Sequence, residues 1–566
     1  MPVDINIMVG GEAGQGIQVV GLILAKSFAR GGCHVFADQD YESRVRGGHN
    51  FFRVRVSDSE VAAIAKPVHI LLAMNRESID LHRKELASRG VIAFDNEKTK
   101  DVDSSSNFFG LPLERLAEEK AGNRLMANTV AVGVASGLMK YSLSILDKVL
   151  REHFGADEIG EANVKAARAG YEYAQHNYKG DFDYRVPQIT DEKRMLITGN
   201  EAIALGAIAA GCKFMAAYPM TPATSIMEYM ASKAKAFDLV VVQPEDEIAA
   251  INMIIGAAFA GVRAMTATSG SGFALMVEGL GLAGITETPI VAVLAQRPAP
   301  AVGLPTRTEQ GDLQFVLTAA PGEFPRAILA PATVEDAFWL TVKAFNLADK
   351  YQLPVLLLTD QHLASSYTTV ERFDASKVTI DRGLLFSAGE SEYRRHAITQ
   401  SGISPRAFPG QEGILVATDA DEHDEEGHLI EDAYTRTQMM LKRLRKLDGL
   451  RGEIGSPRIY GPQNAETTLI GWGSTYGALK EAVDIMRAEG LDANLLHLNE
   501  LWPFPAEAVS SALDQASRSF VVENNATGQL ARLIRSETGK KVTAEILKFD
   551  GRPFTPALIV DELKKR

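Results

Sequence analysis

The chain has 566 residues, with 59 Lys and Arg against 72 Asp and Glu, so that its formal net charge is −13. At about 100 to 200 residues per domain, this length predicts three or four domains. The composition is close to that of an average globular protein, which excludes a disordered, collagen-like or disulfide-built chain. The acidic balance argues against a nucleic-acid partner.

Two cysteines, Cys33 and Cys212, stand far apart in the sequence. They form no CxxC pair, and the chain lacks the four thiolates that would hold an iron-sulfur cluster. The N-terminus has no basic start and no apolar core of a signal peptide. The apolar stretch 248–262 contains Asn252 and is shorter than the roughly 20 residues that span a bilayer. We therefore expect a cytoplasmic protein without a membrane partner.

The first segment, residues 1–180, alternates short apolar strands with helical stretches and predicts an α/β domain. Its first strand runs into the glycine loop GGEAGQG at 10–16, which precedes a helix. Such a loop is either an anion site at a helix N-terminus or a tight packing turn. The spacing matches neither the dinucleotide fingerprint nor the P-loop, so both alternatives stay open. Four arginines follow this loop and concentrate positive charge: Arg44, Arg46, Arg53 and Arg55. They would suit a polyanionic ligand or an acidic partner surface; alternatively, half of them simply face solvent along a strand.

The rest of the chain divides into three parts. Residues 194–361 contain short Val/Ile/Leu strands between Ala/Gly-rich helices, as in a buried parallel sheet. Residues 362–455 are rich in turn formers and charge and are interpreted as a connector. Residues 456–566 form a last α/β domain. Four residues of the connector could bind a metal ion: His423, Asp424, Glu425 and His428. An acidic surface loop is the commoner explanation of such a sequence.

Polar residues follow four successive strands of the segment 194–361. Open parallel sheets bind ligands at the carboxyl ends of their strands, so these residues predict the rim of an active site. Each has a simpler explanation alone, such as a Pro-rich turn at YPMTPAT or a helix cap at PEDE, where Glu245 is the alternative to Glu247. The candidates are Thr221, Glu247, the turn Thr268, Ser269 and Gly270, and the loop arginines Arg297 and Arg307.

These motifs, in this order, resemble the 2-oxoacid:ferredoxin oxidoreductase family. GGEAGQG and SRVRGGHN resemble its γ part, and YPMTPAT, PEDEIAAI, RAMTATSGSGFALM and GLPTRTEQGD its pyrimidine-binding part. IGWGSTYGALKEA and VVENNATGQLARL resemble its C-terminal part. The resemblance implies a multidomain α/β chain: a γ-type domain, then a pyrimidine-type thiamine diphosphate domain with a parallel sheet, then a transketolase C-terminal-like domain. The wording of TEQGD is similar to that of 2-oxoglutarate-type members, in which the γ domain is fused to the α subunit.

The resemblance also implies roles for the candidate residues. Glu247 would contact the aminopyrimidine of thiamine diphosphate, and Thr268, Ser269 and Gly270 would lie against its ring. Thr221 and Arg297 would hold the 2-oxo acid carboxylate, and Arg307, unless it is an exposed loop residue, the distal carboxylate of 2-oxoglutarate. Four further residues would contact either coenzyme A, which takes the acyl group, or another subunit: Gly14, Gly16, Arg44 and Arg46.

The chain has no GDG motif to anchor the diphosphate, and Asn524 and Asn525 have no such partner upstream. The resemblance therefore implies a β subunit that carries GDG, Mg²⁺ and a [4Fe-4S] cluster, in a dimer of αβ units that reduces ferredoxin. The sequence leaves the direction of the reaction open. Two alternatives also stay open: the same chemistry on pyruvate or a branched-chain 2-oxo acid, and a scaffold paralogue without activity.

Overall fold

A computed structural model describes residues 3–43, 47–100, 102, 107–190, 194–387 and 392–566. The chain forms two compact units. The first comprises Met1–Ile197, Ser365–Arg372 and Thr555–Ala557, and the second comprises Thr198–Ala364, Phe373–Phe554 and Leu558–Arg566.

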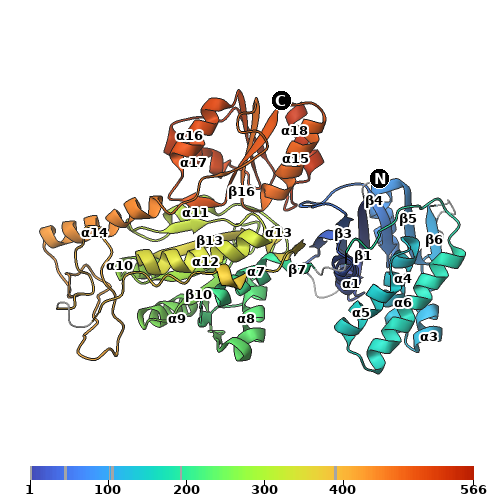
Figure 1. Ribbon diagram of the computed structural model, residues 1–566, viewed down its shortest axis with the longest axis horizontal. Helices are drawn as coiled ribbons and strands as arrows, with labels where there is room; N and C mark the ends of the chain where they lie inside the picture. Colours follow the sequence, from blue (N-terminus) through green and yellow to red (C-terminus); the bar gives the residue numbers. More distant parts are fainter. Residues whose placement is uncertain (1–2, 44–46, 101, 103–106, 191–193, 388–391) are drawn as a thin grey trace. The chain divides into compact units, whose positions relative to one another are not determined.

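The first unit is built on an eight-stranded sheet in the order β6-β5-β4-β1-β3-β2-β14-β7 (Figure 1). Strand β1 pairs antiparallel with β3 and parallel with β4, so the sheet is mixed. The strands are β1 (Asp4–Ala13), β2 (His34–Asp40), β3 (Gly47–Ser57), β4 (Val68–Ala73), β5 (Leu86–Asp95), β6 (Phe108–Leu111), β7 (Met195–Thr198) and β14 (Tyr367–Val370). Strand β14 comes from the segment interpreted as the connector and pairs with β2.

Two helices of this unit, α4 (Ala127–Leu138) and α6 (Glu158–Asn177), pack against each other through small residues. A Cβ on Gly133 of α4 would lie 1.9 Å from the carbonyl oxygen of Ala167 in α6, and one on Gly170 would lie 2.1 Å from that of Val130. Glycine at both positions lets the two helix backbones touch. The helices are α1 (Ile17–Arg30), α2 (Arg76–His82), α3 (Leu113–Ala121), α4 (Ala127–Leu138), α5 (Leu143–Phe154) and α6 (Glu158–Asn177), with short 3₁₀ turns at Arg83–Glu85 and Arg124–Met126.

The second unit contains a seven-stranded sheet in the order β18-β12-β13-β11-β10-β8-β9. All neighbours are parallel except β18 and β12, and the strands are almost wholly apolar, as expected for a sheet covered by helices on both faces. The strands are β8 (Phe214–Ala216), β9 (Val240–Val242), β10 (Ala264–Thr268), β11 (Ile290–Gln296), β12 (Ala327–Leu329), β13 (Pro354–Asp360) and β18 (Glu500–Trp502). The helices are α7 (Gly199–Ala209), α8 (Thr224–Phe237), α9 (Glu247–Phe259), α10 (Gly270–Ile285), α11 (Leu313–Thr318), α12 (Val334–Tyr351) and α13 (Gln361–Ser365).

A five-stranded sheet, β15-β17-β16-β19-β20, forms the C-terminal part of the same unit. Strand β18 leaves this part to pair with β12, and residues of both sheets share one hydrophobic core. The strands are β15 (Arg458–Tyr460), β16 (Thr467–Trp472), β17 (Ala493–Leu498), β19 (Arg518–Glu523) and β20 (Ala544–Leu547). The helices are α15 (Tyr476–Ala488), α16 (Ala506–Gln515), α17 (Gln529–Thr538) and α18 (Pro556–Lys564), with a 3₁₀ turn at Gly473–Thr475. A further 3₁₀ turn, Ala375–Lys377, follows β14.

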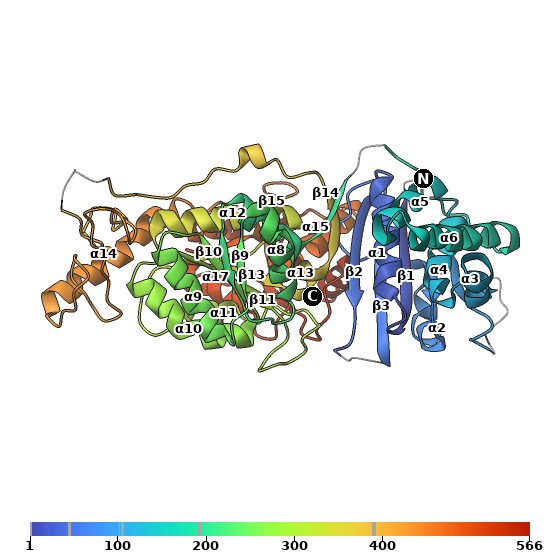
Figure 2. The ribbon, with the colours of Figure 1, turned by 90° about the horizontal axis from the view of Figure 1, so that it is seen from below.

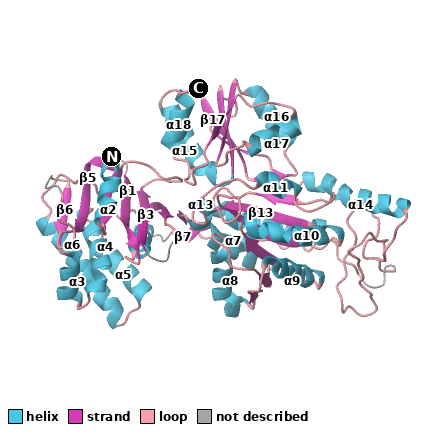
Figure 3. Ribbon diagram, turned by 180° about the vertical axis from the view of Figure 1, so that it is seen from behind, coloured by secondary structure: helices cyan, strands magenta, loops and turns pink. Residues whose placement is uncertain are grey.

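The segment between the two sheets of the second unit is mostly loop and carries one long helix, α14 (Ala433–Arg451) (Figure 3). In two views α14 lies at the end of the second unit remote from α13 (Figure 1, Figure 2). A buried ion cluster attaches it: Lys442 and Lys446 of α14 both pair with Glu287, which follows α10. The connector is therefore fastened to the parallel sheet domain rather than free of it.

Candidate active site

The predicted rim residues lie where the parallel strands end. Strands β8, β9, β10 and β11 run in the same direction, so their carboxyl ends meet at one edge of the sheet. Thr221 follows β8, Glu247 follows β9, Thr268 ends β10 and Arg297 follows β11. The structure thus brings to one edge of the second unit four residues that are far apart in the sequence.

Glu247 is the first residue of α9, and its side chain does not cap that helix. The carboxylate of Asp246 caps it, by accepting from the backbone N–H of Ala249 at 2.7 Å. Glu247 is only 3% exposed, and its Oε1 has no hydrogen-bond partner among the described residues. Glu245 is exposed. A buried carboxyl that does no structural work is a candidate for binding a ligand.

The first turn of α10 lies against this carboxyl. A Cβ on Gly272 would lie 2.5 Å from Oε1 of Glu247 and 2.1 Å from Oγ1 of Thr268, so only glycine leaves both oxygens in place. Thr268 and Ser269 are fully buried, and no side chain caps the N-terminus of α10. Oγ1 of Thr268, like Oε1 of Glu247, has no hydrogen-bond partner within the described chain. The turn predicted to face a flat ring therefore places these two buried oxygens beside the uncapped N-terminus of α10.

Arg297 and Thr221 are in direct contact. Nη1 of Arg297 donates to the backbone carbonyl of Thr221 at 2.6 Å. Arg297 is 6% exposed, and burial lowers the pKa of its guanidinium from the usual value. Thr221 itself is partly exposed.

The loop after β11 brings further acidic residues that the sequence analysis did not select. Asp312 is 8% exposed, and burial raises its pKa to about 6. Burial, and then the charge of Asp312, raises the pKa of Glu309 to about 7. Both residues belong to the motif TEQGD. Two acidic residues in a Pro/Gly loop beyond a buried strand are the sequence signal that could have identified them as site candidates. Arg307, on the same loop, is partly buried and has its Cβ 3.0 Å from the position of a Cβ on Gly551.

The C-terminal domain fixes this loop. Gln310 donates from Nε2 to the carbonyl of Trp472 at 2.8 Å and accepts from the backbone N–H of Asn524 at 3.1 Å. Asn525 donates to the carbonyl of Gln310 and to the carboxylate of Glu523. The two asparagines for which the sequence offers no upstream GDG motif therefore hold the loop that carries Glu309 and Asp312.

The first unit holds the remaining candidates. Gly14 has φ 93° and open space where a side chain would stand, and Gly16, with φ 68°, begins α1. A Cβ on Gly16 would lie 2.1 Å from Nδ2 of Asn128, so close packing explains this glycine. Arg44 and Arg46 lie outside the described residues. The other two arginines are paired, Arg53 with Asp38 and Arg55 with Asp4. A coenzyme A or interface role for this loop stays a prediction.

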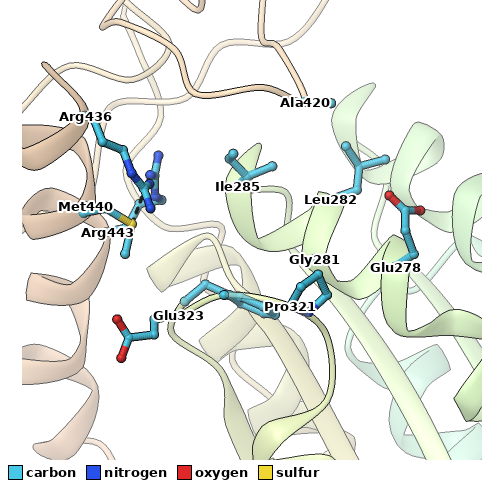
Figure 4. A pocket seen from close by; sticks show the side chains of 12 residues that line it. Glu278, Gly281, Leu282, Ile285, Pro321, Glu323, Ala420, Arg436, Met440 and Arg443 are labelled. Carbon is cyan, nitrogen blue, oxygen red and sulfur yellow. Dashed lines mark hydrogen bonds between the residues drawn. The ribbon is translucent and has the colours of Figure 1, made fainter. Parts of the chain in front are cut away.

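Other features of the described chain do not compete with this site. Within the described ranges no group of three or more His, Cys, Asp or Glu side chains could hold a metal ion, the four connector residues included. A cavity of about 250 Å³ lies at the far end of α10, between Leu282, Ile285 and α14, where Arg436 and Arg443 pair with Glu422 (Figure 4).

In the described part of the chain, no helix is both long and apolar enough to cross a membrane. The cytoplasmic location stays a prediction.

The site fits an aminopyrimidine. Such a ring presents nitrogen acceptors and an exocyclic N–H donor at its edge. This edge of the sheet offers buried carboxyls, with oxygens that have no partner among the described residues, beside an uncapped helix N-terminus. The glycines at 270 and 272 let the carboxyls of Asp312 and Glu247 lie directly against the backbone of this turn. Fold and site together have the features of a thiamine diphosphate-binding domain.

Family models agree with this class. Residues 205–442 match the model "Pyruvate flavodoxin/ferredoxin oxidoreductase, thiamine diP-bdg". Residues 6–173 match "Pyruvate ferredoxin/flavodoxin oxidoreductase", and residues 465–559 match "Pyruvate:ferredoxin oxidoreductase core domain II". The three models follow one another along the chain.

Full-length relatives extend the match. The chain is 34% identical to a 2-oxoacid:ferredoxin oxidoreductase subunit alpha of a Sulfolobus species, over 99% of this chain and 95% of the relative. It is 30% identical to the 2-oxoglutarate oxidoreductase subunit KorA of Mycobacterium tuberculosis, over 94% and 87%. A solved structure of the 2-oxoglutarate:ferredoxin oxidoreductase from Magnetococcus marinus, with 2-oxoglutarate, coenzyme A and succinyl-CoA bound, superposes with a TM-score of 0.93 at 32% identity, covering 100% of this chain and 99% of that one.

The chain therefore belongs to the 2-oxoacid:ferredoxin oxidoreductase family, as an α subunit. This confirms the predicted family, the oxidoreductase class and the multidomain α/β fold.

Proposed function

We propose that this chain is the α subunit of a 2-oxoglutarate:ferredoxin oxidoreductase. The reaction takes 2-oxoglutarate and coenzyme A to succinyl-CoA and CO₂, and the released electrons pass one at a time to ferredoxin. The observation that carries the proposal is the buried carboxyl of Glu247, with an unpartnered oxygen beside the uncapped turn of α10, in a chain that superposes over its whole length on a 2-oxoglutarate enzyme.

Thiamine diphosphate, when bound, supplies the carbon nucleophile that attacks the 2-oxo group and stabilises charge after CO₂ leaves. The chain's own part begins at Glu247, whose carboxyl holds a proton toward a ring nitrogen of the aminopyrimidine. Because the carboxyl is buried and lies against Gly272, its own position is fixed before the ring binds. Thr268, Ser269 and Gly270 would form the wall beside the bound ring and would keep water from it.

Substrate recognition falls to three residues in this proposal. The hydroxyl of Thr221 and the guanidinium of Arg297 bind the carboxylate next to the 2-oxo group, and the contact between them keeps both in one geometry. Arg307 binds the distal carboxylate that distinguishes 2-oxoglutarate from pyruvate. The name of the solved relative and three relatives named KorA support 2-oxoglutarate, whereas others carry the general name 2-oxoacid.

A partner must complete the site. We propose a β subunit that carries the GDG motif, Mg²⁺ and a [4Fe-4S] cluster, in an (αβ)₂ assembly that delivers electrons to ferredoxin. The α9–α10 face supports this proposal. Here neighbouring helices beside Glu247 expose Ile248, Met253 and Leu275 by 49%, 42% and 51%. Large apolar side chains exposed on two neighbouring helices are typical of a subunit interface.

The test is to express the chain with the β subunit from the same organism and to measure coenzyme A-dependent reduction of a viologen dye by a panel of 2-oxo acids. We expect the highest kcat/KM with 2-oxoglutarate. A preference for pyruvate or a branched-chain 2-oxo acid would show that the substrate assignment is wrong.

A second variant separates catalysis from scaffolding. Glu247→Gln keeps the shape of the side chain but cannot hold the proton in the same way, and we expect it to lower kcat by about 10²- to 10⁴-fold while the complex still assembles. A fully active Glu247→Gln complex would favour a scaffold paralogue. Asp246→Asn, which keeps the cap acceptor of α9, is the matched control and should keep most of the activity.

A further inference from the structure

A second buried carboxyl, that of Asp312, borders the same turn as Glu247 and has no assigned role. Asp312 stands at the N-cap position of α11, where an aspartate usually accepts hydrogen bonds from the helix. Its side chain makes no such bond. Instead, Oε1 of Gln529 accepts from the backbone N–H of Gln314 at 2.9 Å, so a residue of α17 satisfies α11 and leaves the carboxyl of Asp312 for another purpose.

The backbone of Asp312 is held firmly over the strand ends. Its N–H donates to Oε1 of Gln296 at 3.0 Å, and Nε2 of Gln296 donates to the carbonyl of Thr359 at 3.1 Å. Gln296 ends β11, and Thr359 lies on the neighbouring strand β13. The position of Asp312 is therefore set by the sheet rather than by a free loop.

The carboxyl of Asp312 lies against the first residue of α10. A Cβ on Gly270 would lie 2.5 Å from Oδ2 and 3.0 Å from Oδ1, so any larger residue would displace the carboxyl. Asp312 is 8% exposed, and Oδ2 has no hydrogen-bond partner among the described residues. Glu247 repeats this pattern two residues further along α10, at Gly272.

Two buried carboxyls with unpaired oxygens thus flank one helical turn. Buried polar atoms in native proteins are nearly always hydrogen-bonded, so two such oxygens on either side of one turn are candidate contacts for a ligand. An aminopyrimidine has polar groups on opposite sides of its ring, a ring nitrogen and an exocyclic amine. If Glu247 serves the ring nitrogen, the amine still requires an acceptor.

We propose that Asp312 binds the exocyclic amino group of the cofactor's aminopyrimidine by accepting a hydrogen bond from it. The inference rests on the proposed function, since it requires thiamine diphosphate to occupy this pocket. The raised pKa of Asp312, about 6, still leaves the carboxylate mostly ionised at neutral pH, as an acceptor must be. Asp312 would then select the amino form of the ring from analogues that carry oxygen at that position.

The test uses an analogue that differs only at the proposed contact. Oxythiamine diphosphate carries a carbonyl oxygen where thiamine diphosphate carries the amine. Binding of each compound to the assembled αβ complex, with Mg²⁺, is measured by titration calorimetry. We expect the wild-type complex to bind thiamine diphosphate at least about tenfold more tightly, the size of a charge-assisted hydrogen bond.

Asp312→Asn replaces the acceptor with a group that also donates. We expect it to weaken thiamine diphosphate, to strengthen oxythiamine diphosphate and to bring the two affinities within about threefold. Glu278→Gln, an exposed carboxylate toward the other end of α10, should keep the wild-type preference. Should D312N fail to assemble, Asp312→Ser gives the same readout, because a hydroxyl also donates and accepts.

An unchanged preference in D312N or D312S would overturn the role of Asp312 and leave the proposed function standing. A wild-type αβ complex that binds no thiamine diphosphate would overturn both. The two failures are therefore distinguishable in one set of titrations.

Discussion

The guanidinium of Arg297 donates to the backbone carbonyl of Thr221 at 2.6 Å and so joins the end of β11 to the loop after β8. The two strands lie on either side of β10, which carries Thr268 and leads into the turn at Gly270. The contact therefore spans the strand whose turn forms the wall of the proposed cofactor site. It also uses one guanidinium nitrogen and leaves others for a substrate carboxylate, because arginine has several donors in a planar fork.

Replacing Arg297 with lysine should separate these two tasks. A single ammonium cannot hold the Thr221 carbonyl and bind a carboxylate with the geometry of a guanidinium. We expect Arg297→Lys to lower kcat/KM for the 2-oxo acid by about 10- to 100-fold, measured by dye reduction in the αβ complex. Thr221→Ala keeps the carbonyl, and hence the contact, and tests the hydroxyl alone. Equal activity of Arg297→Lys and wild type would show that Arg297 does not bind substrate.

Gly272 should be intolerant of even a methyl group. The Cβ of alanine would lie 2.1 Å from Oγ1 of Thr268 and 2.5 Å from Oε1 of Glu247, so one of these side chains must move. We expect Gly272→Ala to weaken thiamine diphosphate binding and to lower kcat by about tenfold or more. The matched control is Gly281→Ala on the same helix, where the added atom meets only the Cβ of Ala320 at 3.7 Å. A Gly272→Ala complex as active as the control would contradict the placement of Glu247.

Activity should respond to pH through Glu309. Burial, and then the nearby charge of Asp312, raises the pKa of Glu309 to about 7, so the side chain is mostly protonated below pH 7 and ionises above it. An added negative charge on the loop of Arg307 repels an anionic substrate. We therefore expect KM for 2-oxoglutarate to rise severalfold between pH 6 and pH 8. Glu309→Gln should keep the low KM across this range, and an identical rise in the variant would assign the titration to another group.

The sequence predicted the site best where chemistry and topology coincide. Thr221, Glu247 and Arg297 each follow an apolar strand, and strand ends of a parallel sheet meet at one edge. Periodicity and turn residues were enough to place them at that edge, while their roles stay predictions. The sequence could not show that Asp246 takes the cap of α9, because adjacent acids at a helix start look alike until the backbone is placed.

Residues that act through long-range contacts were missed for a physical reason. Asp312 is available for a ligand only because Gln529, more than two hundred positions later, satisfies α11 in its place. Similarly, β14 joins the first sheet from within the segment interpreted as the connector, through backbone pairing that leaves little trace in composition. Local pattern finds elements and strand ends, whereas such exchanges of partner between distant segments appear only in the folded chain.

The buried cluster at Glu287 should decide whether the connector stays attached. Glu287 is fully buried; burial would raise its pKa, but Lys442 and Lys446 outweigh that effect and hold the pKa well below the usual value. Burial in turn lowers the pKa of Lys442 to about 8 and that of Lys446 to about 7, since Glu287 offsets only part of the cost. Glu287→Gln would leave two buried ammonium groups without their counter-charge.

We expect Glu287→Gln to lower the free energy of opening of α14 by about 3 to 5 kcal/mol, measured by hydrogen exchange of its amides at pH 7. The loss should shrink as the pH rises, because the lysines then lose their protons. The control Glu278→Gln, at an exposed residue of α10, should change the free energy of unfolding by less than about 0.5 kcal/mol.

His396 adds a second signature. It forms a hydrogen bond with Glu287 at 3.0 Å, and burial lowers the pKa of its imidazole well below 6.5. Its protonation therefore favours the open state, so protection of α14 in the wild type should fall as the pH drops below about 6.5, and protection unchanged between pH 7 and pH 5 would exclude this role for His396.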